Sequence, residues 1–154
     1  MKSNIEISTV DSNALAMLHR LLLRQFEEHH IRVCSEALEK AIAAVIDKEN
    51  LGFFLMAQKD NGVIGFAYVS FNWTLEHCGK SAWLEELYVI PEWRNRGVGR
   101  SLLSAVIQQA RACGCGAIDL EVDQSHAQAE NLYRRAGFSP LSRSRWVKDL
   151  SNKE

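Results

Sequence analysis

The chain has 154 residues, of which 47% are hydrophobic and 24% are charged. This length and composition allow one domain with a well-buried core, and they exclude a disordered or fibrous protein. The net charge of −1 leaves no global basic field for nucleic acid or an anionic membrane, so any anion site must be local.

Targeting and redox signals are weak. No apolar stretch approaches the roughly 20 residues of a membrane span, and residues 1–10 lack the apolar core of a secretory signal. The four cysteines lack metal-type spacing, so we expect no metal site and mostly buried, reduced thiols. The sequence therefore predicts one cytoplasmic domain over residues 1–154, with no nucleic-acid or membrane partner.

The first half of the chain predicts a strand, two helices and a meander of strands. A short strand over residues 5–9 precedes a helix that Asp11 caps, and Ser35 is expected to cap a second helix. The buried positions expected on the two helices are Leu15, Leu18, Leu22 and Phe26, then Leu38, Ala41, Ile42, Val45 and Ile46. Three strands follow, over 52–58, 63–73 and 82–90, and the Asn61-Gly62 pair suits a tight hairpin between the first two.

The second half changes to an alternation of helices and strands. A helical stripe over 102–110 ends near Gly114, and a short strand follows over 117–122. Ser125 and Gln128 match a capping box for a last helix, which Gly137 closes before a strand over 145–150. Hairpins followed by a strand–helix–strand crossover predict a mixed α/β sheet, mostly antiparallel in its N-terminal half and βαβ in its C-terminal half.

The stretch between the strand at 82–90 and the next helix reads R-N-R-G-V-G-R over residues 94–100. Glycines allow a ligand to approach the backbone, and the first amides of a helix together with arginines attract an anion such as a pyrophosphate. A P-loop would need lysine after its second glycine, and a dinucleotide-binding fingerprint would need a third glycine where Leu102 stands. The alternative to an anion site is a plain strand-to-helix turn.

Two motifs resemble those of a known family. The R-x-x-G-x-G pattern after "YVIPE" resembles the acetyl-CoA-binding motif of the GNAT N-acetyltransferases, and "NLYRRAGF" at 131–138 is similar to their tyrosine helix. Residues 84–138 carry the specific motifs, and the resemblance implies a GNAT-type fold for the whole chain. It also implies acetyl-CoA as co-substrate, and direct attack by an amine in a ternary complex.

The resemblance assigns cofactor-binding positions. It implies that the main chain of Leu87, Tyr88 and Val89 pairs with the pantetheine arm. For Val98, in the loop that follows, the alternative is core packing, which is compatible with a place in the loop. The positions that match the pyrophosphate loop are Arg94, Asn95, Arg96, Gly97, Val98, Gly99 and Arg100. On the last helix, His126 stands where family members often have asparagine, and His126 and Ala129 are expected beside the cofactor. The alternative role for His126 is a general base.

The same resemblance implies that Tyr133 lies near the acetyl-CoA sulfur. A coenzyme A thiolate has a pKa of about 8.5–10, close to the roughly 10 of a tyrosine, so a phenol can donate a proton to it with little mismatch. The helix pattern alone predicts a core aromatic instead. With the family match, Tyr133 is predicted as the general acid.

Two adjacent carboxylates precede the glycine loop. "LEELYV" resembles the "LEDL-Y/F-V" strand of diamine and other small-amine acetyltransferases, which makes Glu85 the predicted base, directly or through a water. The alternative is a solvated charge at a strand edge. Strict strand alternation points Glu86 to the opposite side, as a surface or supporting carboxylate. Asp119 and Glu121 are expected to add negative charge to the acceptor site.

The function favoured by these residues is N-acetylation of a small primary amine, with polyamine-like, amino-acid-like and aminoglycoside-like acceptors all open. The alternatives are a protein or peptide N-acetyltransferase and a non-catalytic acyl-CoA-binding module. Acceptor selectivity is expected from the first two helices and from residues 71–83, with Trp73, Glu76, His77 and Trp83 as candidates. A homodimer through the last strands is a further alternative, in which Trp146 lies in either the interface or the core.

Overall fold

The computed structural model describes residues 4–123 and 126–151. The chain separates into two compact units, one up to Glu121 and one from Val122, and each is described by itself. The expectation of one domain over 1–154 stays a prediction.

The first unit is built on a five-stranded sheet whose strand order follows the sequence, β1-β2-β3-β4-β5. The first four strands pair antiparallel, and the last pairs parallel with its neighbour. This confirms the predicted mixed α/β sheet. The strands are β1 Glu6–Thr9, β2 Gly52–Lys59, β3 Gly62–Thr74, β4 Gly79–Val89 and β5 Ile118–Leu120.

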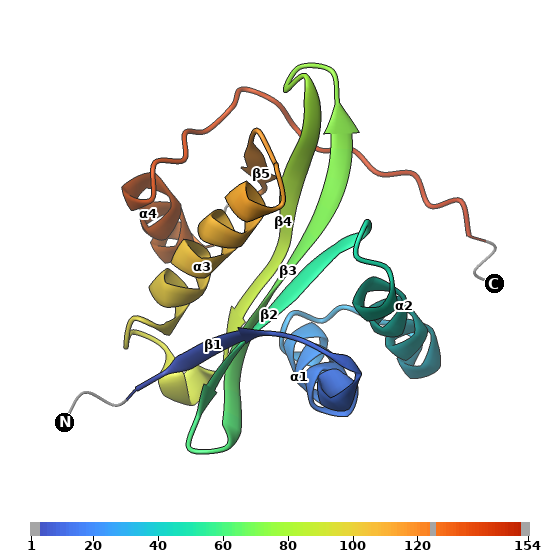
Figure 1. Cartoon of the computed structure of the whole chain (residues 1–154), viewed down its shortest axis with the longest axis vertical. Helices are drawn as coiled ribbons and strands as arrows, with labels where there is room; N and C mark the ends of the chain where they lie inside the picture. Colours follow the sequence, from blue (N-terminus) through green and yellow to red (C-terminus); the bar gives the residue numbers. More distant parts are fainter. Residues whose placement is uncertain (1–3, 124–125, 152–154) are drawn as a thin grey trace. The chain divides into compact units, whose positions relative to one another are not determined.

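Helices cover both faces of this sheet. The helices α1 (Leu15–Glu28) and α2 (Ser35–Asp47) lie on one face, and α3 (Val98–Ala112) lies on the other (Figure 1). The crossover from β4 through α3 to the parallel β5 is the predicted βαβ unit. Two short 3-10 helices, η1 (Ser12–Ala14) and η2 (Pro91–Trp93), complete this unit.

Each helix buries its apolar stripe against the sheet. On the α1–α2 face, Leu18 and Phe66 are fully buried in a cluster that also contains Tyr88. On the α3 face, Leu102 and Val106 are fully buried. Residue 65 is a glycine where β3, β4 and α3 meet closely: a Cβ there would lie 2.7 Å from the Tyr88 carbonyl oxygen of β4 and 3.2 Å from Leu102 Cδ1 of α3.

Several local expectations are corrected. The two central residues of the β2–β3 turn are Asp60 and Asn61, both with positive φ, rather than Asn61 and Gly62. Ser35 is the first residue of α2 and does not cap it. Ala41 is exposed. The thiols are not mostly buried, because Cys34 and Cys78 are exposed and the other two are half-buried.

The second unit contains α4 (Ala127–Arg135), which ends before Gly137 at a φ of 94°. The predicted cap residue Ser125 lies outside the described residues. Residues 139–151 form no strand, so the predicted strand over 145–150 is wrong. A strand exists only through its hydrogen-bonded neighbour, and side-chain alternation cannot supply one. The Trp146 side chain is 89% exposed rather than in a core.

Candidate active site

Within the described part of the chain, the C-terminal half of β4 is paired along one edge only. Its register with β5 covers only Ala82–Leu84 against Ile118–Leu120, whereas β3 stays paired with β4 as far as Val89. The Ile90 amide donates to the Ile64 carbonyl oxygen, toward β3. Because successive residues of a strand direct their groups to alternate sides, the main-chain groups of Val89 point away from β3. No strand of the described residues pairs with this edge beyond Leu84, and the Val89 carbonyl oxygen on it accepts a hydrogen bond from Arg94 Nε.

The glycine turn forms a helix N-terminus, as the sequence predicts. Gly97 has a left-handed φ of 83°, and α3 begins at the next residue. The first intrahelical bond near this end is from the Ser101 amide to the Gly97 carbonyl oxygen, at 3.1 Å. No side chain caps the terminus, so the amides of the first turn are left for another acceptor. The Val98 side chain is 1% exposed, so core packing holds for it.

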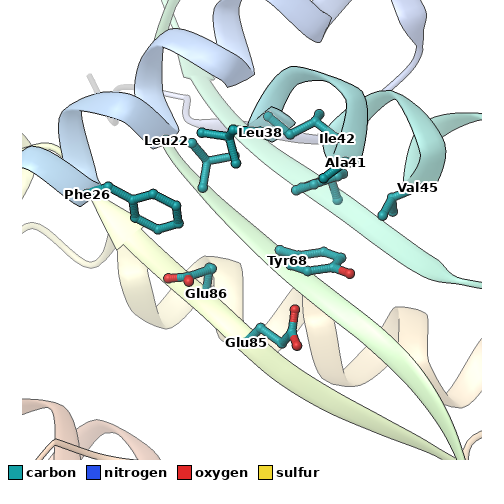
Figure 2. Close-up of a pocket in the computed structure, with 10 residues that line it drawn as sticks. Leu22, Phe26, Leu38, Ala41, Ile42, Val45, Tyr68, Glu85 and Glu86 are labelled. Atoms are coloured by element: carbon teal, nitrogen blue, oxygen red, sulfur yellow. The ribbon is translucent and has the colours of Figure 1, made fainter. Parts of the chain in front are cut away.

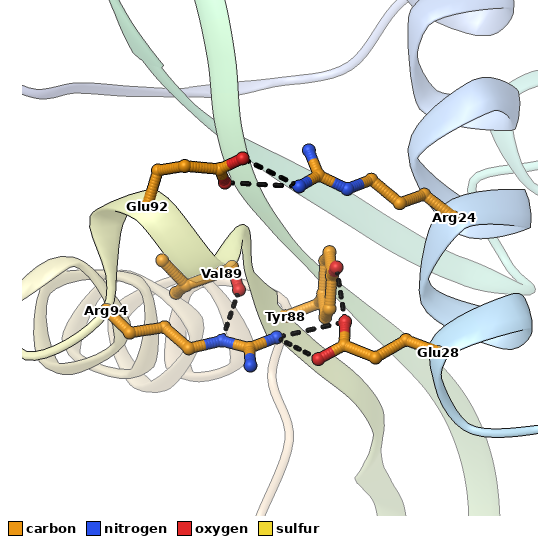
Figure 3. A network of polar contacts seen from close by, with 6 residues as sticks. All are labelled: Arg24, Glu28, Tyr88, Val89, Glu92 and Arg94. Atoms are coloured by element: carbon orange, nitrogen blue, oxygen red, sulfur yellow. Dashed lines mark hydrogen bonds and ion pairs between the residues drawn. The ribbon is translucent and has the colours of Figure 1, made fainter.

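The three arginines of the turn differ in environment. Arg96 stacks on Trp93, with its guanidinium carbon 5.0 Å from the ring centroid, and Arg100 is exposed. Arg94 instead points back to β4 and α1. Its Nε donates to the Val89 carbonyl oxygen at 2.9 Å, and its Nη2 lies 2.8 Å from Glu28 Oε1 (Figure 3). Arg94 thus fastens the end of β4 to the end of α1.

Glu28 is the shared partner in this network. The Tyr88 hydroxyl donates to Glu28 Oε2 at 2.6 Å, and the Arg94 guanidinium lies 5.4 Å above the Tyr88 ring. The hydrogen bond from Tyr88 and the one from Arg94 hold the pKa of Glu28 below its usual value, against the opposing effect of burial. Burial and the Glu28 carboxylate raise the pKa of Tyr88 to about 12. A more exposed pair, Arg24 with Glu92 at 2.9 Å, lies beside this network (Figure 3).

A β-bulge places the two glutamates of β4. Tyr68 of β3 is opposite Glu86, but its neighbour Val69 is opposite Leu84, so Glu85 is an extra residue in the register. A bulge of this kind redirects side chains that strict alternation would send to opposite faces. The expectation that Glu85 and Glu86 point to opposite sides is therefore wrong, because both line the same pocket (Figure 2).

This pocket has a volume of about 150 Å³ and lies between α1, α2 and the sheet. Most of its wall is hydrocarbon, and its only charged lining residues among the described ones are the two glutamates (Figure 2). The exposed Ala41 is one of its walls, which is why that residue is not in the core. The apolar lining residues are Leu22, Phe26, Leu38, Ala41, Ile42, Val45 and Phe54.

The glutamates have different surroundings. Glu85 is exposed, whereas Glu86 is half-buried and accepts a hydrogen bond from Gln25 Nε2 at 2.7 Å. Burial raises the pKa of Glu86, the Gln25 bond opposes this, and the charges of Glu85 and Glu121 add to the rise. Tyr68 lines the pocket beside them, and burial together with Glu85 raises its pKa to about 12. Glu86 is thus part of the pocket rather than a surface residue, and its sequence offered no sign of the bulge.

The aromatic and histidine candidates in residues 71–83 do not line this pocket. Trp73 is 78% exposed. The ring of His77 lies 3.0 Å from Asp119 Oδ2, so both of these residues are engaged with each other. Residues of α1 and α2 line the pocket and the loop candidates do not, and the acceptor roles predicted for both stay predictions.

In the second unit, Tyr133 lies on α4 and is half-buried. Its ring contacts the edge of Phe138 at a centroid distance of 5.8 Å, and its carbonyl oxygen accepts from the Phe138 amide at 3.0 Å. His126 is exposed and precedes the first turn of α4, and Ala129 is half-buried within that turn. The roles predicted for these three residues stay predictions.

The described residues, 4–123 and 126–151, contain neither a membrane-spanning helix nor a cluster of metal ligands. None of their helices is long and apolar enough to cross a membrane. None of their histidine, cysteine and acidic side chains gather in a group of three able to hold a metal ion.

Comparison with known proteins identifies the family. The sequence profile described as "Acetyltransferase (GNAT) family" matches residues 15–138, which is most of the chain. The chain belongs to this family. A relative named aminoglycoside N(6')-acetyltransferase type 1, from Stenotrophomonas maltophilia, is 32% identical over 111 residues, which cover 70% of this chain and 72% of the relative.

Other GNAT relatives are longer. A mycothiol acetyltransferase from Nocardiopsis dassonvillei is 34% identical over 96 residues, or 57% of this chain but 28% of the relative. The chain thus spans only about a quarter of the length of such relatives.

Solved structures agree on the GNAT fold. An aminoglycoside N-acetyltransferase AAC(6')-Iy in complex with CoA has a TM-score of 0.82 at 19% identity, covering 98% of both chains. An integron cassette protein from a salt-marsh metagenome has a TM-score of 0.85 at 22% identity, covering 96% of this chain and 91% of that one.

Proposed function

We propose that this GNAT protein is an acetyl-CoA-dependent N-acetyltransferase that acts on the primary amine of a small molecule. One observation carries the proposal: two features lie along β4. After its end, a left-handed glycine precedes the uncapped N-terminus of α3, and within it two glutamates contribute carboxylates to a pocket. The first feature suits the diphosphate of a nucleotide carrier, and the second suits an ammonium group. Relatives named for the acetylation of small amines agree with this conclusion.

The cofactor would bind along β4 and across the start of α3. The amides of Val98, Gly99 and Arg100 would receive the pyrophosphate, with the exposed side chains of Arg96 and Arg100 as counter-ions. The alternation of β4 favours Leu87 and Val89 for the pantetheine arm, because both lie on the same side of the strand. Arg94 would position the cofactor indirectly, because it binds both the Val89 carbonyl oxygen and Glu28 and so holds the end of β4 in place.

The acceptor amine needs to lose a proton before it attacks. An aliphatic amine with a pKa near 10.4 is neutral only about once in 2,500 molecules at pH 7, and making it nucleophilic costs about 4.6 kcal/mol. Glu85, at the exposed side of the pocket, would accept this proton directly or through a water. Glu86 would hold the ammonium form in place. Alignment of the amine with the thioester supplies the larger part of the rate.

Acetyl-CoA supplies an activated acetyl thioester, and attack of the amine forms the amide bond while the carbon–sulfur bond breaks. The departing thiolate then needs a proton. Tyr133 is our candidate for the donor, with a phenol of suitable acidity on the helix that carries the family motif. Its substitution by phenylalanine keeps the ring that contacts Phe138 and removes only the hydroxyl.

A thiol-release assay with acetyl-CoA and a panel of amines tests the function. We expect free thiol in proportion to an acetylated product identified by mass, and a Tyr133→Phe variant that keeps its affinity for acetyl-CoA but loses turnover. A chain that binds acetyl-CoA and releases no thiol with any amine would be a non-catalytic acyl-CoA-binding module. Release with peptides alone would favour the protein N-acetyltransferase alternative.

A further inference from the structure

The pocket in Figure 2 separates charge from hydrocarbon. Both carboxylates come from adjacent residues of β4, at one end of the group of lining residues, and the opposite wall consists of α1 and α2 side chains such as Leu22, Leu38 and Val45. A ligand that fits this wall presents hydrocarbon to it, because an unpaired polar group loses its water there without a replacement. A ligand that fits the glutamates presents a cation to them.

The volume limits the size of the apolar part. An engineered protein cavity of about 150 Å³ lined by Leu, Ile and Phe binds benzene, and this pocket is of the same size with the same kinds of side chain. This pocket is open on the side where Glu85 and Ala41 are exposed, so the volume limits only the part of the ligand that lies among the apolar side chains, which is about six carbon atoms. One sugar ring of an aminoglycoside has a similar size but would place its hydroxyl and ammonium groups against apolar side chains.

A buried amide holds one of the two carboxylates of the pocket. The Gln25 side chain is 4% exposed, and its Nε2 donates to Glu86. Its Oε1 is fully buried and accepts no hydrogen bond from the described part of the chain. An unsatisfied buried acceptor is uncommon in native proteins. Gln25 does not line the pocket, so this side chain acts on a ligand only through the Glu86 carboxylate that it holds in place.

From these observations we infer that the acceptor is a primary amine with a single cationic group and a compact apolar body of about six carbons, of the alkylamine or arylalkylamine class. The inference rests on the proposed function and narrows its substrate. A second ammonium at the far end of the chain would lie against hydrocarbon, and a carboxylate beside the amine would face Glu85 and Glu86. Polyamines, amino acids and aminoglycosides are therefore poor acceptors.

Matched acceptor pairs test the inference by kcat/KM. Hexylamine is compared with 1,6-diaminohexane, and 2-phenylethylamine with phenylalanine, so that each pair differs by one charged group. We expect the monoamine to be better by about tenfold or more in each pair, because the extra charge has no partner. Among straight amines from three to six carbons, kcat/KM rises about fourfold for each methylene that enters the pocket.

A charge placed in the apolar wall sharpens the test. Ala41→Glu adds a carboxylate at the exposed pocket-lining position of α2, and we expect the ratio of diaminohexane to hexylamine to rise about tenfold or more. Ala37→Glu is the matched control, because Ala37 is exposed on the same helix and does not line the pocket. It adds the same charge and should leave the ratio unchanged. Thermal unfolding of both variants shows whether either has lost its fold.

Direct binding separates the inference from the proposed function. Calorimetry of the chain with hexylamine, without acetyl-CoA, should show binding with a negative heat-capacity change, and diaminohexane should bind more weakly. Turnover of spermidine or kanamycin at higher kcat/KM than hexylamine would overturn the inference and leave the acetyltransferase intact. Hexylamine binding without thiol release from any amine would keep the pocket assignment and overturn the function.

Discussion

The glycine turn and the apolar pocket follow one another along β4, but the chain builds them differently. The turn is local: a left-handed glycine and the first amides of α3, which we propose as its binding groups, lie within a few residues of one another. The pocket draws on α1, α2, β2, β3 and β4, and its two carboxylates face one space only because β4 contains a bulge. A local site is specified by a motif, whereas an assembled site depends on the packing of distant segments.

The largest effect is expected from a carboxylate in the turn. Gly99→Asp places a negative charge in the first turn of α3, where it suits the helix dipole but faces the diphosphate. Two charges about 4 Å apart near a protein surface interact by about 4 kcal/mol, so we expect the Kd for acetyl-CoA to rise about a thousandfold.

Ser104→Asp, exposed on the same helix, is the control for Gly99→Asp. Calorimetric titration with acetyl-CoA measures both variants, and their unfolding curves should match that of the parent chain. Unchanged affinity of Gly99→Asp would remove the pyrophosphate from this turn.

The next effect concerns the chemistry rather than the binding. Glu85→Gln keeps the shape of the pocket and removes a base, so we expect kcat at pH 7 to fall about a hundredfold, at the lower end of general-base effects. The Kd for acetyl-CoA should change less than twofold in the same variant.

Steady-state rates from pH 6 to 9 decide the role of Glu85. As the acceptor amine loses its proton in solution at higher pH, the deficit of Glu85→Gln should shrink. Parallel profiles of kcat for parent and variant across this range would contradict the base assignment.

A smaller effect is expected on stability at the pocket. Burial raises the pKa of Glu86, so the folded state binds the proton of this carboxyl more tightly than the unfolded chain does. This favourable contribution is complete below the pKa of the unfolded chain and is lost as pH rises through the folded pKa. Glu86→Gln should therefore raise the Tm at pH 7 by about 2–4 °C, equivalent to about 1 kcal/mol, and by less at pH 4.

The same variant should bind amines more weakly, since it loses one of the two carboxylates of the pocket. Thermal scans at the two pH values with and without hexylamine measure both effects. A lower Tm at pH 7 would show that the Glu86 carboxylate stabilises the fold.

The smallest effects are expected in the network behind the turn. Hydrogen bonds lower the pKa of Glu28, so its contribution is present above the pKa of the unfolded chain and is lost as pH falls through the folded pKa. Glu28→Gln should reduce the free energy of unfolding by about 1 kcal/mol at pH 7 and by little at pH 3. Arg24→Met, which breaks the exposed pair with Glu92, should change it by less than about 0.5 kcal/mol.

Urea unfolding at pH 7 and pH 3 measures both of these variants. Equal losses for Glu28→Gln and Arg24→Met would mean that Glu28 has no special part in holding the strand end.

Much of the fold was predictable because it depends on short-range patterns. The apolar stripes of α1 and α3 and the alternation of β2 and β3 predicted these elements, and the βαβ order predicted the parallel β5. The predictions that failed concern positions where hydrogen-bond pairing between strands decides the local structure. The alternation at 145–150 has no strand partner in the described structure. The β2–β3 turn shifted by one residue because Lys59 pairs with Gly62.

The candidate site divides in the same way. The positions of Gly97 and the start of α3 followed from the motif, and the pairing of Arg94 with Glu28 did not, because these residues are 66 positions apart in the sequence. The hydrogen bond between Gln25 and Glu86 could not be predicted for the same reason, since these residues are 61 positions apart. Their hydrogen bond depends on where α1 packs against β4.

The sequence by itself determined the family, the order of most elements and the glycine turn at the start of α3, because each of these depends on residues close together in the chain. The tertiary structure alone decided that two adjacent glutamates face one pocket, that hydrocarbon from two helices surrounds them, and that one arginine of the turn serves the fold. Side-chain direction at a bulge and contacts between distant helices are set by long-range packing, which no short segment encodes.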